Sequence, residues 1–412
     1  MTLDVAQIQA DFPMLARQIN GKRLIYLDSA ATSQKPAAVI EAMDNYYRNA
    51  YASVNRGAYQ IAAEATDLLE HARTAVARFV GAPRAHEIIF TKNATEAMNL
   101  FAQSWGRANL SQGDVVVLTE MEHHANIVPW HMLREAIGID IRWIPLTETG
   151  ELDLANLDLL LDGAKLVSVT AMSNVLGTLN PIRRIADAAH AAGAAMIADA
   201  SQYVPHLPTD VTELGVDAMI FTGHKMLGPT GVGVLWGKTE LLEAMPPFLG
   251  GGDMIMQVTK EGFTTNDLPH KFEAGTPAIA EIIGLGAAVE YLESLGMDAV
   301  REHEVSLTAY ALRTLNERFG EDITVHGPAE PAARGGVLSI AYKDVHPHDI
   351  SQVLDQSNVC VRAGHHCAKP LMQVMGVNAT ARASLYVYND EADVDALADA
   401  LESADDIFGL EI

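Results

Sequence analysis

The sequence has only two cysteines, Cys360 and Cys367, among its 412 residues. Two cysteines in a chain of this length argue against a disulfide framework and indicate a reducing compartment. Positive charge is also scarce, because 28 lysines and arginines face 53 aspartates and glutamates, which gives a formal net charge of −25. A surface of this charge repels nucleic acid backbones and anionic membranes, so we expect neither as a partner.

Long apolar runs are absent as well. No uninterrupted apolar segment reaches the roughly 20 residues that a membrane-spanning helix needs. Asp4 and Asp11 occupy the N-terminal stretch where a secretory signal would be basic and then apolar. Hydrophobic residues still make up 49% of the chain, which is enough for a large core. We therefore expect a globular, cytoplasmic protein, and the length predicts two domains.

The order of the segments is typical of an α/β protein. Short apolar runs alternate with amphipathic ones, as in βαβ units that feed a mostly parallel sheet. The expected strands are residues 86–90, 114–118, 141–145, 165–172, 194–200, 217–223 and 231–237. Gly and Pro recur through residues 250–277. This pattern predicts that the chain leaves the sheet there. We expect a large α/β domain at 23–276 and a small α+β domain formed by 1–22 plus 277–412.

Five polar clusters are expected at the carboxyl ends of these strands, where ligands of such sheets bind. They are "NATEAMNL" (93–100), "MEHHANIVPW" (121–130), "SNVLGTLNP" (173–181), "DASQ" (199–202) and "TGHK" (222–225). Taken singly, each cluster has an ordinary explanation, since histidines at strand ends are mostly structural and an Asp after a strand is often a helix cap. The convergence of all five on one edge favours a functional site.

Lys225 and Asp199 indicate the chemistry of this site. A lysine held in an apolar crevice loses its proton easily and then attacks carbonyl groups. A carboxylate one strand away completes the pair that pyridoxal phosphate needs, namely an amine for a Schiff base and a partner for the pyridinium nitrogen. The amides around Ala94 and Thr95 begin a helix and point at an anion, so a phosphate fits there. The pairing is suggestive without being unique.

The stretch "VRAGHHCAKP" (361–370) surrounds one thiol with potential positive charge. Neighbouring cations raise the thiolate fraction of a cysteine, and Arg362, His365, His366 and Lys369 are the candidates near Cys367. A zinc site at His365, His366 and Cys367 is the alternative interpretation. Adjacent residues rarely all reach one tetrahedral ion, and the sequence has no second ligand pair at a suitable spacing, so we expect no metal. Arg362 has an alternative role in a structural ion pair. We expect Cys360, within the apolar "NVCVRAG", to be buried and inert.

Over nearly its whole length the sequence resembles the group II, SufS-type cysteine desulfurases of the class V aminotransferase fold. The matching stretches include "YLDSAATSQKP", "NATEAMNL", "MEHHANIVPW", "SNVLGTLNP", "DASQ", "TGHKMLGPTGVGVLWG", "FEAGTP", "RAGHHCAKPLM" and "RASLYVYN". The resemblance implies a PLP-dependent transferase of fold type I with a mostly parallel central sheet and a smaller α+β C-terminal domain. It also implies a homodimer that binds pyridoxal 5'-phosphate, converts L-cysteine to L-alanine and supplies sulfur for iron–sulfur cluster assembly.

The resemblance also implies roles for individual residues. Lys225 would hold the cofactor as a Schiff base, Asp199 would pair with its pyridine nitrogen, and His123 would stack on its ring. Cys367 would attack the substrate sulfur and keep it as a persulfide. The other implied cofactor contacts are Gln202 at the phenolic oxygen, Ala94, Thr95, Thr222 and His224 at the phosphate, and Thr276 at the phosphate of the neighbouring subunit. Asn174, Arg382 and Arg362 would bind the substrate.

The sulfur acceptor and the substrate stay open at this point. Such enzymes pass the persulfide to a SufE-like protein or to a SufU-like zinc protein. The stretch "DVHPHDI" resembles the SufU-partnered kind, in which His348 would bind the acceptor's zinc, although His348 is also placed to cap a helix. The alternative activities on this scaffold are selenocysteine lyase, acting on L-selenocysteine, and cysteine sulfinate desulfinase. A non-enzymatic alternative is a sulfur-relay or metal scaffold.

Overall fold

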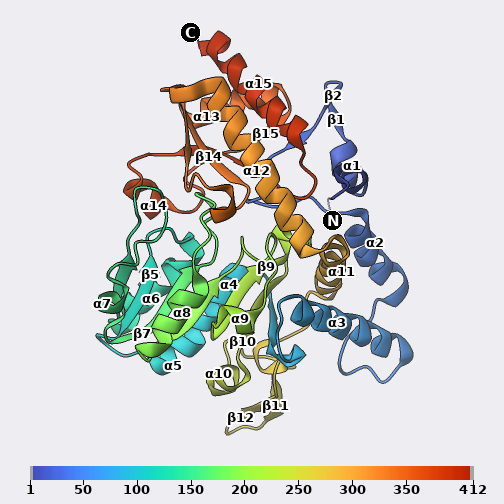
Figure 1. Ribbon diagram of the computed structural model, residues 1–412. Coiled ribbons are helices and arrows are strands. Elements are labelled where there is room, and N and C mark those ends of the chain that lie inside the picture. The colour runs from blue at the N-terminus through green and yellow to red at the C-terminus, as the bar shows by residue number, and fades with distance from the viewer. Residues whose placement is uncertain (1–2, 409–412) are drawn as a thin grey trace.

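A seven-stranded sheet forms the centre of the computed structural model, which describes residues 3–408 (Figure 1). Its strand order is β4-β10-β9-β8-β7-β5-β6. The strands are β4 (Ile88–Thr91), β5 (Val115–Thr119), β6 (Asp140–Ile144), β7 (Ala164–Thr170), β8 (Ala195–Asp199), β9 (Ala218–Thr222) and β10 (Gly233–Gly237). Strands β5 to β9 pair in parallel, and β10 alone runs antiparallel to both its neighbours. Each of the seven expected strands is present, so the mostly parallel sheet is confirmed.

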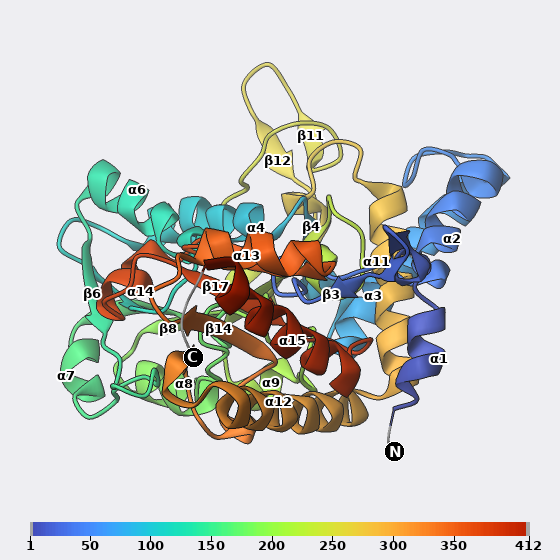
Figure 2. The same ribbon diagram turned by 90° about the horizontal axis from the view of Figure 1, so that it is seen from above.

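Both faces of this sheet are buried, because alternate strand residues enter two different cores. In β4, Ile88 and Phe90 belong to one core and Ile89 to the other. Helices α4 (Ala94–Phe101) and α6 (Val128–Ile137) cover the Ile89 face. Helices α3 (Gln60–Phe79), α8 (Ile182–Ala191) and α11 (Ile279–Leu295) contribute to the opposite core, and Figure 2 shows α8 across the sheet from α4 and α6. Burial on both faces explains why these strands read as continuous apolar runs in the sequence.

The C-terminal part adds a second, antiparallel sheet of order β13-β14-β17-β16. Its strands are β13 (Ile323–His326), β14 (Val337–Tyr342), β16 (Arg362–Gly364) and β17 (Thr380–Ser384). Helices α12 (Met297–Phe319), α13 (Pro347–Gln356) and α15 (Glu391–Phe408) pack with it in a core of their own. This region lies above the central sheet in Figure 1, and the expected smaller α+β unit is confirmed.

Two segments connect these parts. Strand β3 (Ile25–Tyr26) pairs in parallel with β15 (Val359–Cys360), so the chain start joins the C-terminal region. Helix α11 packs against α2 (Ala37–Asn45) and α3 on the side of the central sheet. The division into 23–276 and 1–22 plus 277–412 stays a prediction.

The predicted excursion is a hairpin of β11 (Ile255–Val258) and β12 (Phe263–Thr265) that projects from the body (Figures 1 and 2). The remaining short elements are α1 (Val5–Ala10), β1 (Gln18–Ile19), β2 (Lys22–Arg23), α5 (Arg107–Asn109), α7 (Leu157–Leu161), α9 (Val211–Leu214), α10 (Thr239–Ala244) and α14 (Lys369–Val374).

Lys35 fastens the segment after β3 to the carboxyl end of β9. Its Nζ donates to the carbonyl oxygens of Ser33 at 2.7 Å and His224 at 2.9 Å. Burial lowers the pKa of Lys35 to about 7. An unfolded lysine keeps a pKa of about 10.4, so the unfolded chain binds more protons than the folded chain between these values.

We therefore expect the thermal midpoint of the protein to rise relative to that of Lys35→Met between about pH 7 and about pH 9. Below about pH 6 both states of the wild type hold the proton, and the difference between the two proteins becomes constant. Thermal unfolding of both proteins across this range measures the effect. A difference that does not change with pH would contradict it.

Candidate functional site

A cavity of about 210 Å³ lies at the carboxyl ends of the central strands and is closed on one side by the C-terminal sheet. The predicted site residues that line it are Ala94, Thr95, His123, Asn174, Asp199, Gln202, Thr222, His224, Lys225, Arg362, Cys367 and Arg382. Thr276 and His348 do not line it, and both are exposed. The structure therefore brings all five strand-end clusters and the Cys367 segment into one space.

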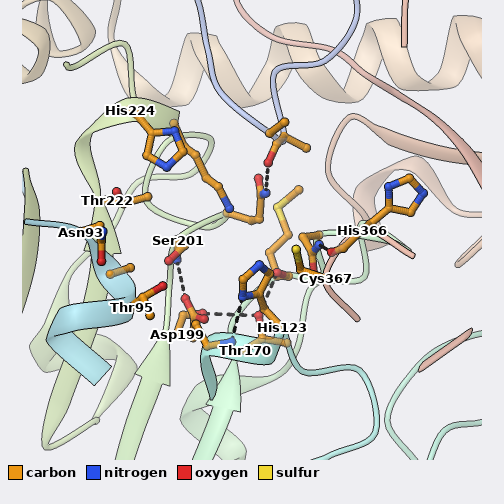
Figure 3. A pocket seen from close by; sticks show the side chains of 18 of the residues that line it. Asn93, Thr95, His123, Thr170, Asp199, Ser201, Thr222, His224, His366 and Cys367 are labelled. Atoms are coloured by element: carbon orange, nitrogen blue, oxygen red, sulfur yellow. Dashed lines mark hydrogen bonds between the residues drawn. The ribbon is translucent and has the colours of Figure 1, made fainter. Parts of the chain in front are cut away.

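One end of the cavity is built to hold an anion. The N-terminus of α4 opens into it, and Asn93 caps this helix by accepting a hydrogen bond from the amide of Glu96 at 2.9 Å. Gly233 lets β10 approach closely, since a Cβ there would come within 2.3 Å of the carbonyl carbon of Asn93. Figure 3 shows Thr95, Thr222 and His224 on this same side. Free amides and hydroxyls at a helix N-terminus are the donors that a phosphate needs.

His123 and Asp199 lie in the middle of the cavity (Figure 3). The amide of Ala125 donates to Nδ1 of His123 at 3.0 Å, and burial, helped by the charge of Lys225, lowers the pKa of His123 to about 3. His123 is therefore an uncharged flat ring at neutral pH. Asp199 ends β8 with 4% exposure and accepts a hydrogen bond from the amide of Ser201 at 3.0 Å. A buried carboxylate there is suited to a cationic partner.

Lys225 ends the short helical turn Gly223–Lys225 that follows β9, and its electrostatic surroundings favour a free amine. Burial lowers the pKa of Lys225 to about 8, and the charge of Arg382 acts in the same direction while Asp199 opposes both. The neighbouring His224 is also neutral, because burial and then Lys225 lower its pKa to about 4. A lysine with a pKa this close to neutrality can act as a nucleophile or a base.

The two arginines of the cavity come from neighbouring strands of the C-terminal sheet. Arg382, only 3% exposed in its side chain, donates through Nη1 to the carbonyl of Asn174 at 2.8 Å. Arg362 pairs with Asp28, with 3.0 Å between Nη2 and Oδ2. The structural ion pair considered for Arg362 is therefore present, although the same side chain also lines the cavity.

Cys367 sits in a loop with an unfavourable backbone. His366 and Cys367 have φ angles of 51° and 55°, in the left-handed region that costs a residue with a side chain roughly 1–2 kcal/mol. Hydrogen bonds hold this loop to the central sheet: the His124 amide donates to the Cys367 carbonyl at 2.7 Å, and Nδ2 of Asn174 donates to the His366 carbonyl at 2.6 Å. The Lys369 amide also donates to Nε2 of His124 at 3.0 Å. Such strain persists only where the surroundings fix it.

The source of positive charge near Cys367 differs from the expectation. Burial, with the charge of Arg382, lowers the pKa of His366 to about 3, so the expectation that this ring charges the thiol is wrong. Its Nε2 instead lies 2.8 Å from Oγ1 of Thr380. The cations close enough to interact with a charge on Cys367 are Arg362, Arg382 and Lys225. A negative charge on Cys367 acts to raise the pKa of each of them. These three side chains line the same cavity as Cys367.

The second cysteine lies in a different environment. Cys360 is half-buried in β15, and burial, Asp355 and Asp28 raise the pKa of its thiol. The expected full burial is thus only partly reached, while the electrostatics agree with an unreactive thiol. Cys367 is exposed and faces the cavity.

Comparison with known proteins assigns the family. Residues 25–397 match the model of the class-V aminotransferase family. The chain is 49% identical to a probable cysteine desulfurase from Streptomyces coelicolor, over 99% of this chain and 98% of that one. It is 47% identical to a cysteine desulfurase from Yersinia pestis, over 99% and 100% of the two chains. The chain belongs to the class-V aminotransferase family, among its cysteine desulfurases.

Solved structures of cysteine desulfurases share this fold. The apo structure from Thermococcus onnurineus superposes with a TM-score of 0.94 at 36% identity and covers 100% of this chain and 99% of its own. The Escherichia coli cysteine desulfurase CsdA, in an S-sulfonic acid form, gives a TM-score of 0.91 at 37% identity over 99% and 100%. Fold type I is therefore confirmed, and the non-enzymatic alternative is not retained.

Cysteine desulfurases of this family are pyridoxal-phosphate-dependent, which confirms the predicted cofactor. The cavity fits this group on its own evidence. Among residues 3–408, buried Oγ1 of Thr222 and Oε1 of Gln202 have no hydrogen-bond partner. A buried polar atom without a partner is costly, and both atoms belong to residues that line the cavity where a phosphate and a ring oxygen would lie.

Several cavity residues escaped sequence reasoning. They are Ala30, Ala31, Asn93, Ala125, Thr170, Met172 and Ser201. The helix-capping pattern "NATE" could have indicated Asn93. His124 anchors the Cys367 loop through the Lys369 amide. It was not among the predicted site residues, although it is adjacent to His123, which was. Within residues 3–408, no group of three or more His, Cys, Asp or Glu side chains is arranged to hold a metal ion, and no helix is long and apolar enough to cross a membrane.

We predict that His124→Ala loosens the Cys367 loop without unfolding the protein. The substitution removes the acceptor of the Lys369 amide, and one hydrogen bond is worth about 1 kcal/mol, so amide exchange at residue 369 should become about fivefold faster. Hydrogen-exchange mass spectrometry of the peptide that contains Lys369 measures this. His71→Ala, at an exposed position of α3, serves as the control. Unchanged exchange in His124→Ala would mean that this contact does not order the loop.

Proposed function

We propose that this protein is a group II, SufS-type cysteine desulfurase that converts L-cysteine to L-alanine and holds the sulfur as a persulfide on Cys367. One observation carries the proposal: the thiol of Cys367 and the amine of Lys225 belong to residues that line the same cavity, although 142 positions separate them in the chain. The near full-length identity with cysteine desulfurases supports the same activity.

The cofactor would occupy the cavity between α4 and the Cys367 loop. Lys225 would bind it covalently, Asp199 would pair with the ring nitrogen, and neutral His123 would stack on the ring. Gln202 would face the phenolic oxygen, and the phosphate would lie against Ala94, Thr95, Thr222 and His224. When bound, pyridoxal phosphate supplies an electron sink that stabilises negative charge at the substrate Cα.

The substrate would bind between the cofactor and the C-terminal sheet. Arg382 is suited to hold its carboxylate, because a guanidinium offers two parallel N–H donors and because its buried Nε has no partner among residues 3–408. Arg362 and Asn174 line the same end of the cavity. When it is not bound to the cofactor, Lys225, whose pKa burial lowers to about 8, would be the base that takes the substrate Cα proton.

Sulfur transfer then needs a thiolate beside the substrate sulfur. The Cys367 sulfur attacks the substrate sulfur, so an S–S bond forms and the bond from Cβ to sulfur breaks. The released electron pair stays with the carbon skeleton, and two protons convert that skeleton to alanine. Overall, L-cysteine and a thiol become L-alanine and a persulfide, with no external oxidant or reductant. The anchored loop keeps the thiol in place for this attack.

We predict that Cys367→Ser binds L-cysteine but lowers alanine release at least about a hundredfold, because the nucleophile is lost. Mass spectrometry after incubation with L-cysteine should find one added sulfur on Cys367 of the wild type and none in the variant. Cys360→Ser is the matched control and should keep both products. Lys225→Ala should lose both products together. Persulfide on Cys360 in Cys367→Ser would contradict these roles.

We also propose a homodimer in which Thr276 reaches the phosphate of the neighbouring subunit. The loop that carries Thr276 is rigid at its start, since buried Arg73 donates to Glu273 at 2.7 Å and the Phe90 amide donates to the same carboxylate at 2.7 Å. Thr276 itself is exposed. The nearby hairpin exposes Met256, Val258 and Phe263, which is typical of a surface that another chain covers. Free cysteines and a reaction that needs a reduced thiol support a cytoplasmic location.

The persulfide would pass to an acceptor protein for iron–sulfur cluster assembly, and a SufU-like zinc protein is favoured over a SufE-like one. His348 supports this choice because it is exposed at the start of α13. It stacks on exposed His346, with ring centroids 5.1 Å apart. An exposed neutral imidazole is a good zinc ligand.

We predict that His348→Ala lowers acceptor-stimulated turnover at least about tenfold, since a lost zinc ligand has effects of this size. Turnover with a small-molecule thiol as acceptor should stay unchanged, because His348 lies outside the cavity. Alanine formation with and without a SufU-like protein measures both, with His71→Ala as control. Equal stimulation of the variant and the wild type would contradict a role of His348 at the acceptor's zinc, and no stimulation of the wild type would contradict a SufU-like acceptor.

A further inference from the structure

A fully buried acid lies directly before His123. Glu122 is 0% exposed and is not among the residues that line the cavity, so neither the cofactor site nor the sulfur transfer described above uses it. Burial raises the pKa of Glu122 to about 8, because a charge is costly at this place. Apolar replacements of buried ionic groups are often neutral or stabilising. The turn after β5 therefore does not need this acid for stability alone.

The carboxyl group of Glu122 joins three separate parts of the chain. Its Oε1 accepts hydrogen bonds from Oγ1 of Thr119, at the end of β5, at 2.6 Å and from the amide of Thr170, at the end of β7, at 2.9 Å. Its Oε2 accepts from Nδ2 of Asn126 at 2.7 Å. A buried polar network whose members all have partners is rigid.

Two of these partners continue to the residues that would face the cofactor ring. The amide of Asn126 donates to the carbonyl of His123 at 2.8 Å, so the Glu122 side chain and the backbone together close the turn that carries the His123 ring. Thr170 is the direct neighbour of Asp199 in the parallel pairing of β7 and β8. Figure 3 shows His123, Thr170 and Asp199 in the same part of the cavity.

We propose that Glu122 is a positioning residue for the cofactor, which holds His123 and Asp199 in the relative positions that the flat ring of pyridoxal phosphate needs. The proposal rests on the ring placement in the proposed function, with His123 on the ring face and Asp199 at its nitrogen. Glu122 touches neither the cofactor nor the substrate and acts through these two residues. Functional side chains keep their geometry when a supporting layer of hydrogen bonds fixes them, and loss of that layer loosens the bound group.

Glutamine at position 122 cannot make the same set of contacts. If its NH₂ group takes the place of Oε2, two donors face each other, since Asn126 offers its own NH₂ group there. Asn126 cannot turn over, because its Oδ1 already accepts from Nε1 of Trp130 at 3.0 Å and from Oγ of Ser168 at 2.5 Å. If the NH₂ group takes the place of Oε1, it meets the amide of Thr170, which is also a donor.

A second substitution restores the pattern. In Glu122→Gln combined with Asn126→Asp, the acid and the amide change places, so the new amide at position 122 donates to the new carboxyl group at position 126. The other oxygen at position 126 can still accept from Trp130 and Ser168. An oxygen also remains at position 122 for its two donors, and the number of acids is unchanged.

Two measurements on the holoenzymes test the proposal without depending on turnover. The visible circular dichroism per bound cofactor reports how firmly the ring is oriented, and the loss of visible absorbance during dialysis reports how fast the cofactor is released. We expect Glu122→Gln to weaken the dichroism and to release the cofactor about tenfold faster, because a buried donor is left without a partner. The double variant should return both values toward those of the wild type.

Glu87→Gln is the matched control for loss of a buried carboxyl group. Glu87 is 4% exposed, lies outside the cavity lining, and accepts from Nε1 of Trp236 at 3.1 Å and Oγ1 of Thr239 at 2.7 Å. The Thr239 hydroxyl can also accept, so glutamine fits at this position. Both measurements should equal those of the wild type.

Wild-type dichroism and release in Glu122→Gln would overturn the proposal, and so would a double variant that behaves like the single one. If Glu122→Gln does not fold, Thr119→Val removes one hydrogen bond of the same carboxyl group. Weaker dichroism in that variant supports the proposal, and unchanged dichroism overturns it. Alanine formation from L-cysteine by the wild type tests the proposed function separately. If no alanine forms, that function fails, while the two cofactor measurements still decide the role of Glu122.

Discussion

The attachment of the Cys367 loop to the carboxyl edge of the central sheet is the constraint on which the rest of this site depends. The loop comes from the C-terminal region, and its two left-handed residues have no local reason to adopt that geometry. Hydrogen bonds from His124 and Asn174 supply the reason, and both residues follow strands of the other region. The thiol therefore faces Lys225 only when both parts of the chain are folded and packed together.

Burial does most of the chemical tuning in this cavity. It removes positive charge from His123, His224 and His366 and brings the pKa of Lys225 to about 8. The guanidinium groups keep their charge through such burial, because their ordinary pKa is so high. Neutral rings, a weakly basic amine and the carboxylate of Asp199 thus lie where the cofactor ring would bind, while the two guanidinium groups lie at the other end of the cavity, on the C-terminal sheet. A protonated histidine near the thiol would have added positive charge among these uncharged rings.

Much of this arrangement could be predicted from the sequence, for identifiable reasons. The seven strands were visible because burial on both faces produces continuous apolar runs, and the strand-end clusters converge because parallel strands end at one edge. His366 was misjudged because its protonation depends on burial by β17 and on Arg382, which lies 16 positions away in the chain. The contact between Asp28 and Arg362 spans 334 positions, so no local pattern could have indicated it.

Asp28 also bears on why one thiol of two is suited to react. Its carboxylate lies near Cys360, where it adds to burial and to Asp355 in disfavouring the thiolate. The same carboxylate pairs with Arg362 at 3.0 Å and makes only a longer contact of 3.4 Å with Arg382, which is the more deeply buried of the two arginines. Cys367 lines the cavity together with the two arginines. The negative charge of Asp28 thereby disfavours the thiolate of Cys360 in β15, while Cys367 shares its cavity with two guanidinium groups.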